Sequence, residues 1–124
     1  MTPFSRGAAY TYRKVDLDAR IEASSGEALT LICLEEAVAS LGQVIAAIEN
    51  KPEQIPREAL SRAHGIAIWL ARSVSSDNPL SGPLIQFYGG VAATIARNLT
   101  HSSPLELART RDDLNDLLQA VRSA

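Results

Sequence analysis

Apolar residues recur every three or four positions from residue 24 onward, which is the period of an amphipathic helix. We therefore expect four helices, over residues 24–50, 56–75, 83–100 and 104–122. The residues that share the inward face of these helices are Leu34, Ala37, Val38, Leu41, Val44, Ile45, Ile48, Leu60, Ala63, Ala67, Leu70, Val74, Leu84, Phe87, Tyr88, Val91, Ile95, Leu99, Leu107, Leu114, Leu117, Leu118 and Val121.

Start and stop signals support these boundaries. Ser24–Glu27 and Ser103–Glu106 both have the spacing of a capping box, in which a hydroxyl and a carboxylate satisfy the first amides of a helix. Lys51-Pro52 ends the first helix, and Pro56 suits the first turn of the second. The polar stretch 75–83 is a loop by composition.

Four long helices joined by short loops predict an all-α, antiparallel four-helix bundle. The chain has the size of one domain, with residues 24–122 forming the bundle. Residues 1–23 show no sustained stripe although they contain Phe4, Tyr10 and Tyr12. We expect them to form a tail or short helix that docks on the bundle.

Two glycines interrupt the third predicted helix. Gly89-Gly90 weakens that helix by about 1 kcal/mol for each glycine relative to alanine. We therefore expect either a close contact with another helix or a bend at this point.

Composition narrows the class of protein. The 124 residues are 46% hydrophobic and 21% charged, with a formal net charge of −2, which excludes a strongly basic nucleic-acid binder. Cys33 is the only cysteine, so a reducing, cytoplasmic environment fits best. No uninterrupted apolar run approaches the about 18 residues of a membrane span, and the N-terminus lacks a signal-peptide pattern, so we expect neither.

Few residues suggest chemistry. We find no phosphate-binding glycine motif, no paired metal-ligand histidines and no nucleophile elbow, so we expect neither an enzyme nor a cofactor. The adjacent carboxylates Glu35–Glu36 and Asp112–Asp113 point about 100° apart and predict solvated faces. His101 lies at a predicted helix end, where an imidazolium can interact with the last carbonyls.

His64 offers an alternative. A helical histidine on a four-helix bundle of this length resembles a histidine phosphotransfer domain. That family follows its histidine with a lysine three residues later and then a glycine, whereas Ala67 and Ile68 occupy these places here.

Some apolar residues lie outside the predicted core faces. Leu29 and Ile32 point away from the core stripe of the first helix, and Trp69 lies nearly opposite Ala67 on the second, with Ile66 beside the stripe. These residues require a second buried surface. The tail, a second copy of the chain in a homodimer, or another protein could supply it, and tryptophan is enriched at binding hot spots.

The order of features resembles the FliS family of flagellin export chaperones. Ala9-Tyr10 matches that family's Ala-Tyr tail, and Ala23-Ser24-Ser25 matches its Ala-Ser-Pro helix start. Leu84-Ile-Gln-Phe87-Tyr88 is similar to its Leu-x-x-Leu-Tyr segment, and Asp112-Asp-Leu114-x-x-Leu117-Leu118 is similar to its leucine-rich last helix. The likeness spans nearly the whole chain.

The resemblance implies a cytoplasmic chaperone whose client is the disordered C-terminal segment of flagellin, with other flagellar export components as further partners. It also implies that Tyr10 and Tyr12 gate or dock on a groove of the bundle. From helical phase alone we assign client contacts to Leu29, Ile32, Ile66 and Trp69. The alternatives are a phosphotransfer module that uses His64 and a helical adaptor with a different client.

Overall fold

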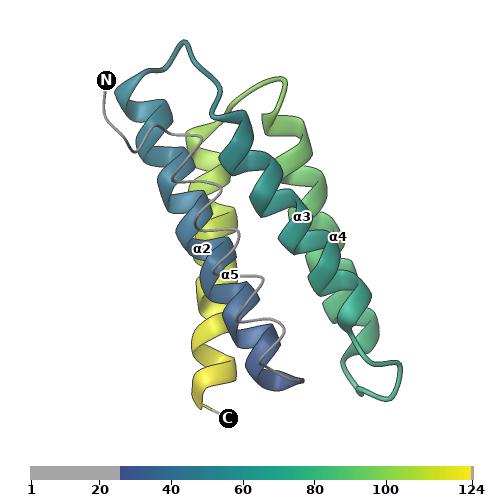
Figure 1. Ribbon diagram of the computed structural model, residues 1–124. Coiled ribbons are helices and arrows are strands. Elements are labelled where there is room, and N and C mark those ends of the chain that lie inside the picture. Colours follow the sequence, from purple (N-terminus) through teal and green to yellow (C-terminus); the bar gives the residue numbers. More distant parts are fainter. Residues whose placement is uncertain (1–25, 124) are drawn as a thin grey trace.

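The computed structural model describes residues 26–123, and these form four helices without a strand. The helices are α2 (Glu27–Asn50), α3 (Arg57–Ser73), α4 (Ser81–Asn98) and α5 (Pro104–Ser123) (Figure 1). The predicted all-α helical bundle is therefore confirmed for this part of the chain. The predicted tail, with Phe4, Tyr10 and Tyr12, lies outside the described residues.

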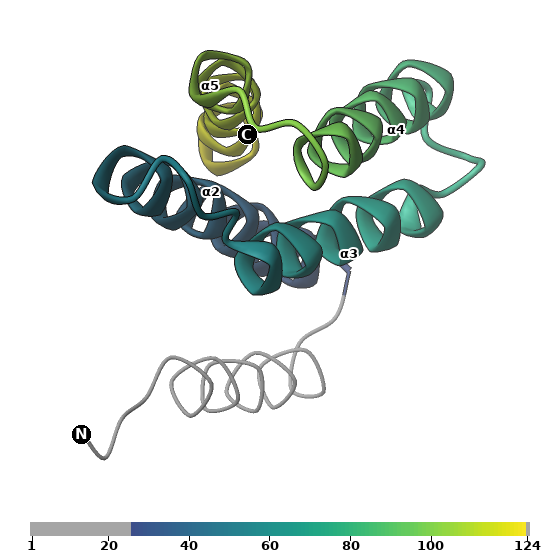
Figure 2. The same cartoon turned by 90° about the horizontal axis from the view of Figure 1, so that it is seen from above.

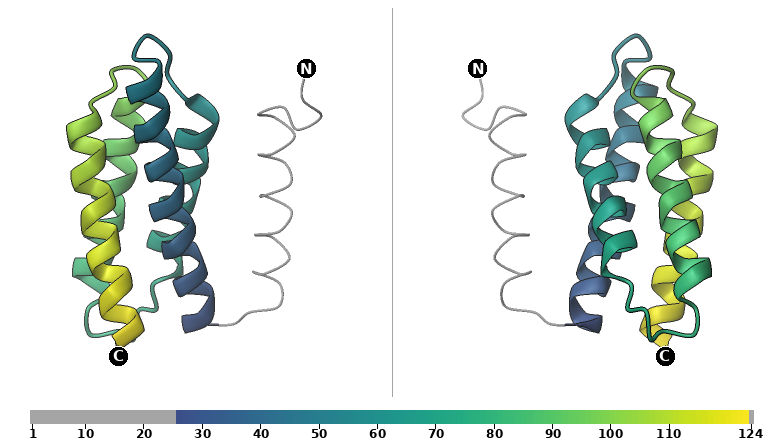
Figure 3. Two further views of the ribbon diagram at one scale, coloured as in Figure 1. Left: turned by 90° about the vertical axis from the view of Figure 1, so that its left-hand side faces the viewer. Right: turned by 90° about the vertical axis from the view of Figure 1, so that its right-hand side faces the viewer.

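The helices are arranged as two closely packed pairs. α2 packs against α5, α3 packs against α4, and α2 and α3 join the pairs, whereas α4 and α5 make the fewest contacts of the neighbouring helices (Figure 2). One side view shows α2 between α5 and α3 (Figure 3).

The loops after α2 and α4 lie at one end of the bundle and the loop after α3 lies at the other, so consecutive helices run in opposite directions (Figure 1). We call the end where α2 and α4 begin the Gly26 end, and the opposite end the Asn98 end. The two pairs diverge toward the Gly26 end (Figure 1).

The predicted inward faces form most of the core. Leu34, Leu41, Leu60, Leu70 and Ile95 are fully buried, as their helical phase predicts. Seven of the predicted positions are instead only partly buried: Val38, Val74, Leu84, Phe87, Leu99, Leu117 and Val121. All of them except Val38, midway along α2, and Leu99, at the Asn98 end, lie toward the Gly26 end. The core is thus complete along the helix centres and thins toward that end.

Helix boundaries differ from prediction by a few residues. The residue before α2 is Gly26, at φ 56°, a left-handed backbone that glycine adopts without a steric penalty, and among residues 26–123 no side chain caps this helix. Glu27 is thus the first residue of α2, and Ser24 of the predicted capping box lies outside the described residues. Lys51 ends α2 as expected, and its N–H donates to the Ala47 carbonyl at 2.9 Å.

Gly89 and Gly90 have no packing role among the described residues. Both are exposed, and a Cβ atom added at either would meet nothing within 4 Å. The expected close helix contact at this point is therefore wrong. Helix α4 continues through both glycines, from Ser81 to Asn98.

Helix α2 is by length and composition apolar enough to cross a membrane, contrary to the expectation from the sequence. Half of that stretch is buried inside the bundle. Because the core helix of a soluble protein meets the same criterion, this finding is weak evidence for a span.

Candidate functional site

The four residues assigned to client contacts lie on the two helices that join the pairs, α2 and α3. Ile32 and Ile66 are buried, with 9% and 8% of their surfaces exposed, and both belong to the core cluster. Leu29 and Trp69 are partly buried and pack against that cluster. The structure thus separates two inner residues from two residues that still reach the surface.

An ion pair connects α2 and α3. The Arg62 Nε atom lies 2.7 Å from a Glu36 carboxylate oxygen, and their side chains are only 6% and 15% exposed. Because the helices run in opposite directions, residues four and seven before Glu36 lie level with residues four and seven after Arg62. Ile32 therefore lies level with Ile66, and Leu29 with Trp69. We call these four residues, along the line where α2 and α3 meet, the α2–α3 seam.

The Glu36–Arg62 pair corrects two expectations. Glu36 is not on a solvated face, and Glu35 also has a partner, since its carboxylate accepts a hydrogen bond from Arg122 at 2.7 Å. Arg62 is the one charged residue that is buried among residues 26–123. Helical phase within one helix could not reveal pairs between helices.

Cys33 behaves as a small hydrophobe. It is buried, and burial, with a smaller contribution from the Glu36 charge, raises the pKa of its thiol to about 11. A thiol held neutral in this way is a poor nucleophile.

The Gly26 end carries most of the large apolar side chains that are not fully buried. Two of them, Leu80 and Ile85, expose 60% and 46% of their surfaces. The partly buried apolar side chains at this end of the four helices are Leu29, Leu31, Ile68, Trp69, Val74, Leu84, Phe87, Leu117 and Val121. This end therefore offers apolar surface that the described helices cover only in part.

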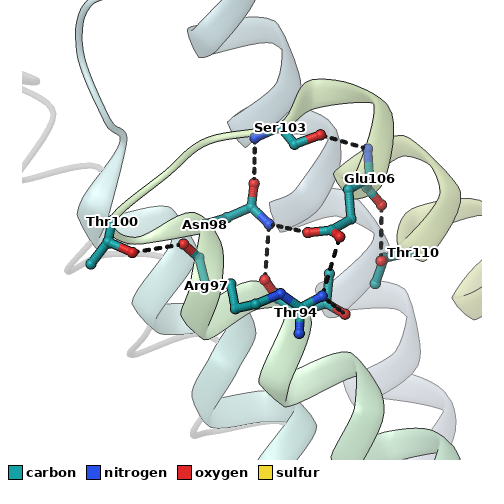
Figure 4. A network of polar contacts seen from close by, with 7 residues as sticks. All are labelled: Thr94, Arg97, Asn98, Thr100, Ser103, Glu106 and Thr110. Atoms are coloured by element: carbon teal, nitrogen blue, oxygen red, sulfur yellow. Dashed lines mark hydrogen bonds and ion pairs between the residues drawn. The ribbon is translucent and has the colours of Figure 1, made fainter.

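At the Asn98 end a polar network connects α4 to α5 (Figure 4). Asn98 is fully buried, and its amide nitrogen donates to the Thr94 carbonyl at 2.8 Å and to the Glu106 carboxylate at 3.0 Å. Its amide oxygen accepts the Ser103 N–H at 2.6 Å. All three bonds use one side chain, so Asn98 fixes the turn between the helices.

Glu106 links the same turn to the surface. Its carboxylate also accepts a bond from Arg97 at 3.1 Å, and these bonds from Arg97 and Asn98 lower its pKa. Only half of the predicted capping box forms here. The Glu106 N–H donates to Ser103 Oγ at 3.3 Å, as a capping box requires. The Ser103 N–H, however, donates to the amide oxygen of Asn98 and not to the Glu106 carboxylate. The capping-box pattern predicted where α5 begins, but not that Asn98 would accept the Ser103 N–H.

The remaining candidates do not converge. His64 is partly buried on α3, and His101 is exposed beyond the end of α4. Within residues 26–123, no three histidine, cysteine or acidic side chains group closely enough to hold a metal ion. Asp112 forms an ion pair with Arg111 at 3.2 Å, as expected for a surface carboxylate.

Among the described residues, partly covered apolar side chains thus gather at the Gly26 end. Comparison of the chain with protein-family models, with curated proteins and with solved structures finds no match.

Proposed function

We propose that this chain is an export chaperone that binds the disordered C-terminal segment of flagellin. The observation that carries the proposal is the partly covered apolar surface of the Gly26 end, which includes Leu29 and Trp69. The likeness of the sequence to the FliS family supplies the identity of the client. In this proposal the protein is cytoplasmic and acts by binding, without a cofactor or a catalytic step.

A disordered client needs a surface of this kind. Ordering a flexible segment costs conformational entropy, so a long and mostly apolar contact is needed for useful affinity. Covering the apolar positions of flagellin's terminal segment would prevent premature polymerisation and keep the chain unfolded for export.

Burial divides the roles of the four assigned residues. Leu29 and Trp69 are only partly buried, so they would contact the client directly. Ile32 and Ile66 are almost fully buried, so they would support these two from beneath. In the same proposal Tyr10 and Tyr12 belong to a tail that docks on the antiparallel bundle and gates the client surface, which would lower apparent affinity by the closed fraction.

A direct test uses a synthetic peptide of the flagellin C-terminal segment and the full chain. We expect a complex that co-elutes in gel filtration, and a change in fluorescence of the protein's only tryptophan, Trp69, on titration. A scrambled peptide of the same composition is the control. The absence of a complex at micromolar concentrations would remove flagellin as the client.

A further inference from the structure

The edge where α4 meets α5 changes character along its length. At the Asn98 end, the Asn98 amide donates to the Glu106 carboxylate at 3.0 Å, and Arg97 donates to the same carboxylate at 3.1 Å. One turn further along α5, the Thr110 hydroxyl donates to the Glu106 carbonyl of its own helix at 3.0 Å and does not cross the edge. From there to the Gly26 end, no hydrogen bond or ion pair joins α4 to α5 among the described residues.

Apolar side chains replace the polar ones along this edge, and they stay partly exposed. Phe87 lies eleven residues before Asn98 and Leu117 eleven residues after Glu106, which is about three turns, so each points in the same direction as the bonded residue of its helix. Asn98 is fully buried in this direction, whereas Phe87 and Leu117 are only partly buried. The edge therefore loosens toward the Gly26 end, in agreement with the divergence of the two helix pairs (Figure 1).

The opposite edge of the bundle is held more firmly. α2 and α3 pack together more closely than α4 and α5, and the mostly buried ion pair between Glu36 and Arg62 joins them at 2.7 Å. In the view along the bundle, α5 lies against α2 and α4 lies against α3 (Figure 2). A rotation of the α3–α4 pair about the α2–α3 seam therefore breaks the fewest contacts, because it separates only α4 from α5.

We propose that the α4–α5 edge opens at the Gly26 end in the free chain, while the polar network at the Asn98 end stays closed. The opening breaks apolar contacts that are already incomplete and that have no directional requirement. The hydrogen bonds of Asn98 are directional and resist the same displacement. An open edge exposes the core side chains of Tyr88, Leu114 and Leu118, so the motion controls access to the interior of the bundle. It is a property of the free chain and does not depend on the flagellin proposal.

Cys33 provides a reporter of this opening. It is the only cysteine of the chain, and 2% of its surface is exposed. Burial, with a smaller contribution from the Cys33 thiol, raises the pKa of Tyr88, which indicates that the thiol on α2 lies near this side chain on α4. Rotation of α4 away from α2 and α5 uncovers the thiol, whereas a loss of order confined to the Asn98 end leaves it covered.

The reaction of Cys33 with excess dithiodipyridine tests the proposal. The reaction rate is measured on the full chain at urea concentrations below the unfolding transition, and the free energy of global unfolding is measured in parallel. Opening of one edge exposes little surface, so the rate should depend weakly on urea and exceed by at least about 10-fold the rate that global unfolding allows. A rate equal to that limit at every urea concentration would overturn the proposal.

Spin labels locate the opening. Two double variants in a Cys33→Ala background carry labels at exposed positions across the α4–α5 edge: Gln86→Cys with Asp116→Cys toward the Gly26 end, and Ala93→Cys with Arg109→Cys toward the Asn98 end. The second pair is the first moved by about two turns along both helices, so the two pairs are matched in direction. Double electron–electron resonance should give a distance distribution about twice as broad for the first pair. Equal widths, or a broader distribution for the second pair, would refute an opening at the Gly26 end.

Discussion

The two ends of the bundle hold their helices together in different ways. At the Asn98 end, a fully buried amide makes three hydrogen bonds, two of which, to Ser103 and Glu106, cross the turn between α4 and α5. At the Gly26 end, Phe87 on α4 and Leu117 on α5 stay only partly buried. The pairs converge at the first end and diverge at the second (Figure 1).

The difference shows what each kind of contact does. Hydrogen bonds are directional, so a saturated network fixes one geometry and leaves no spare capacity for another molecule. Apolar contact is non-directional and scales with area, so side chains that are only partly covered retain the capacity to bind a partner. The polar end is suited to holding the fold, and under the proposed function the apolar end binds the client.

The largest effect is expected from removing the amide at the polar end. Asn98→Ala deletes three bonds at a buried site and leaves the Ser103 N–H without its acceptor, so the free energy of unfolding should fall by about 3 kcal/mol. Urea denaturation measures the change. Asn115→Ala, a helical asparagine on α5, is the control and should change stability by less than about 0.5 kcal/mol. A loss below about 1 kcal/mol for Asn98→Ala would mean that packing, not the network, holds this end.

A somewhat smaller loss is expected midway between the ends. Arg62→Met takes the guanidinium away from the Glu36 carboxylate, and we expect about 2 to 3 kcal/mol of destabilisation because the pair is mostly buried. Adding Glu36→Leu should restore most of it, since a matched apolar pair avoids the desolvation of either charge. If the double variant is no more stable than the single one, the pair contributes through other contacts.

The apolar end should respond in binding more than in stability. Trp69→Ala should weaken binding of the flagellin peptide by about 2 kcal/mol, while the free energy of unfolding should fall by about 1 kcal/mol. Leu105→Ala, at the opposite end and 64% exposed, is the control and should change neither. Tryptophan fluorescence is lost in this variant, so calorimetry measures the affinity. A stability loss of 3 kcal/mol or more would make Trp69 a core residue.

The smallest effect concerns pH. The bonds from Arg97 and Asn98 lower the pKa of Glu106, so its ionised form stabilises the fold above the ordinary carboxyl pKa of about 4.3. This contribution is lost as pH falls through the lowered pKa. Glu106→Gln should therefore be less stable than the natural chain at pH 7, and the difference should shrink as pH falls through the lowered pKa, as measured by urea denaturation over a pH series. A difference that stays the same throughout the acid range would show that the charge is irrelevant.

The sequence predicted the helices because their apolar period and proline positions are local properties. Residues such as Leu41 and Ile95 are buried as predicted, since any bundle buries the centre of its stripes. The apolar pattern of a helix could not predict that Phe87 and Leu117 stay partly buried. The same pattern is found whether neighbouring helices converge or diverge. That difference depends on tertiary geometry.

The missed polar pairs have a similar cause. Glu36–Arg62 and Asn98–Glu106 join residues of different helices, and helical phase gives the direction of a side chain but not the identity of what it meets. A buried Arg62 is recognisable in hindsight from its place beside the apolar stripe of α3. Asn98 carries a weaker signal, as the last residue of a helix just before a capping box.

The pairing of the helices also has a consequence for biosynthesis. α3 and α4 are adjacent in the chain and are joined by a loop of residues 74–80, so they can associate early and at a low entropic cost of loop closure. α2 instead packs against α5, the last of the four described helices in chain order. The most apolar of these helices must therefore wait until α5 has been synthesised to gain this partner, and a chain cut short before residue 104 would leave that face without its cover.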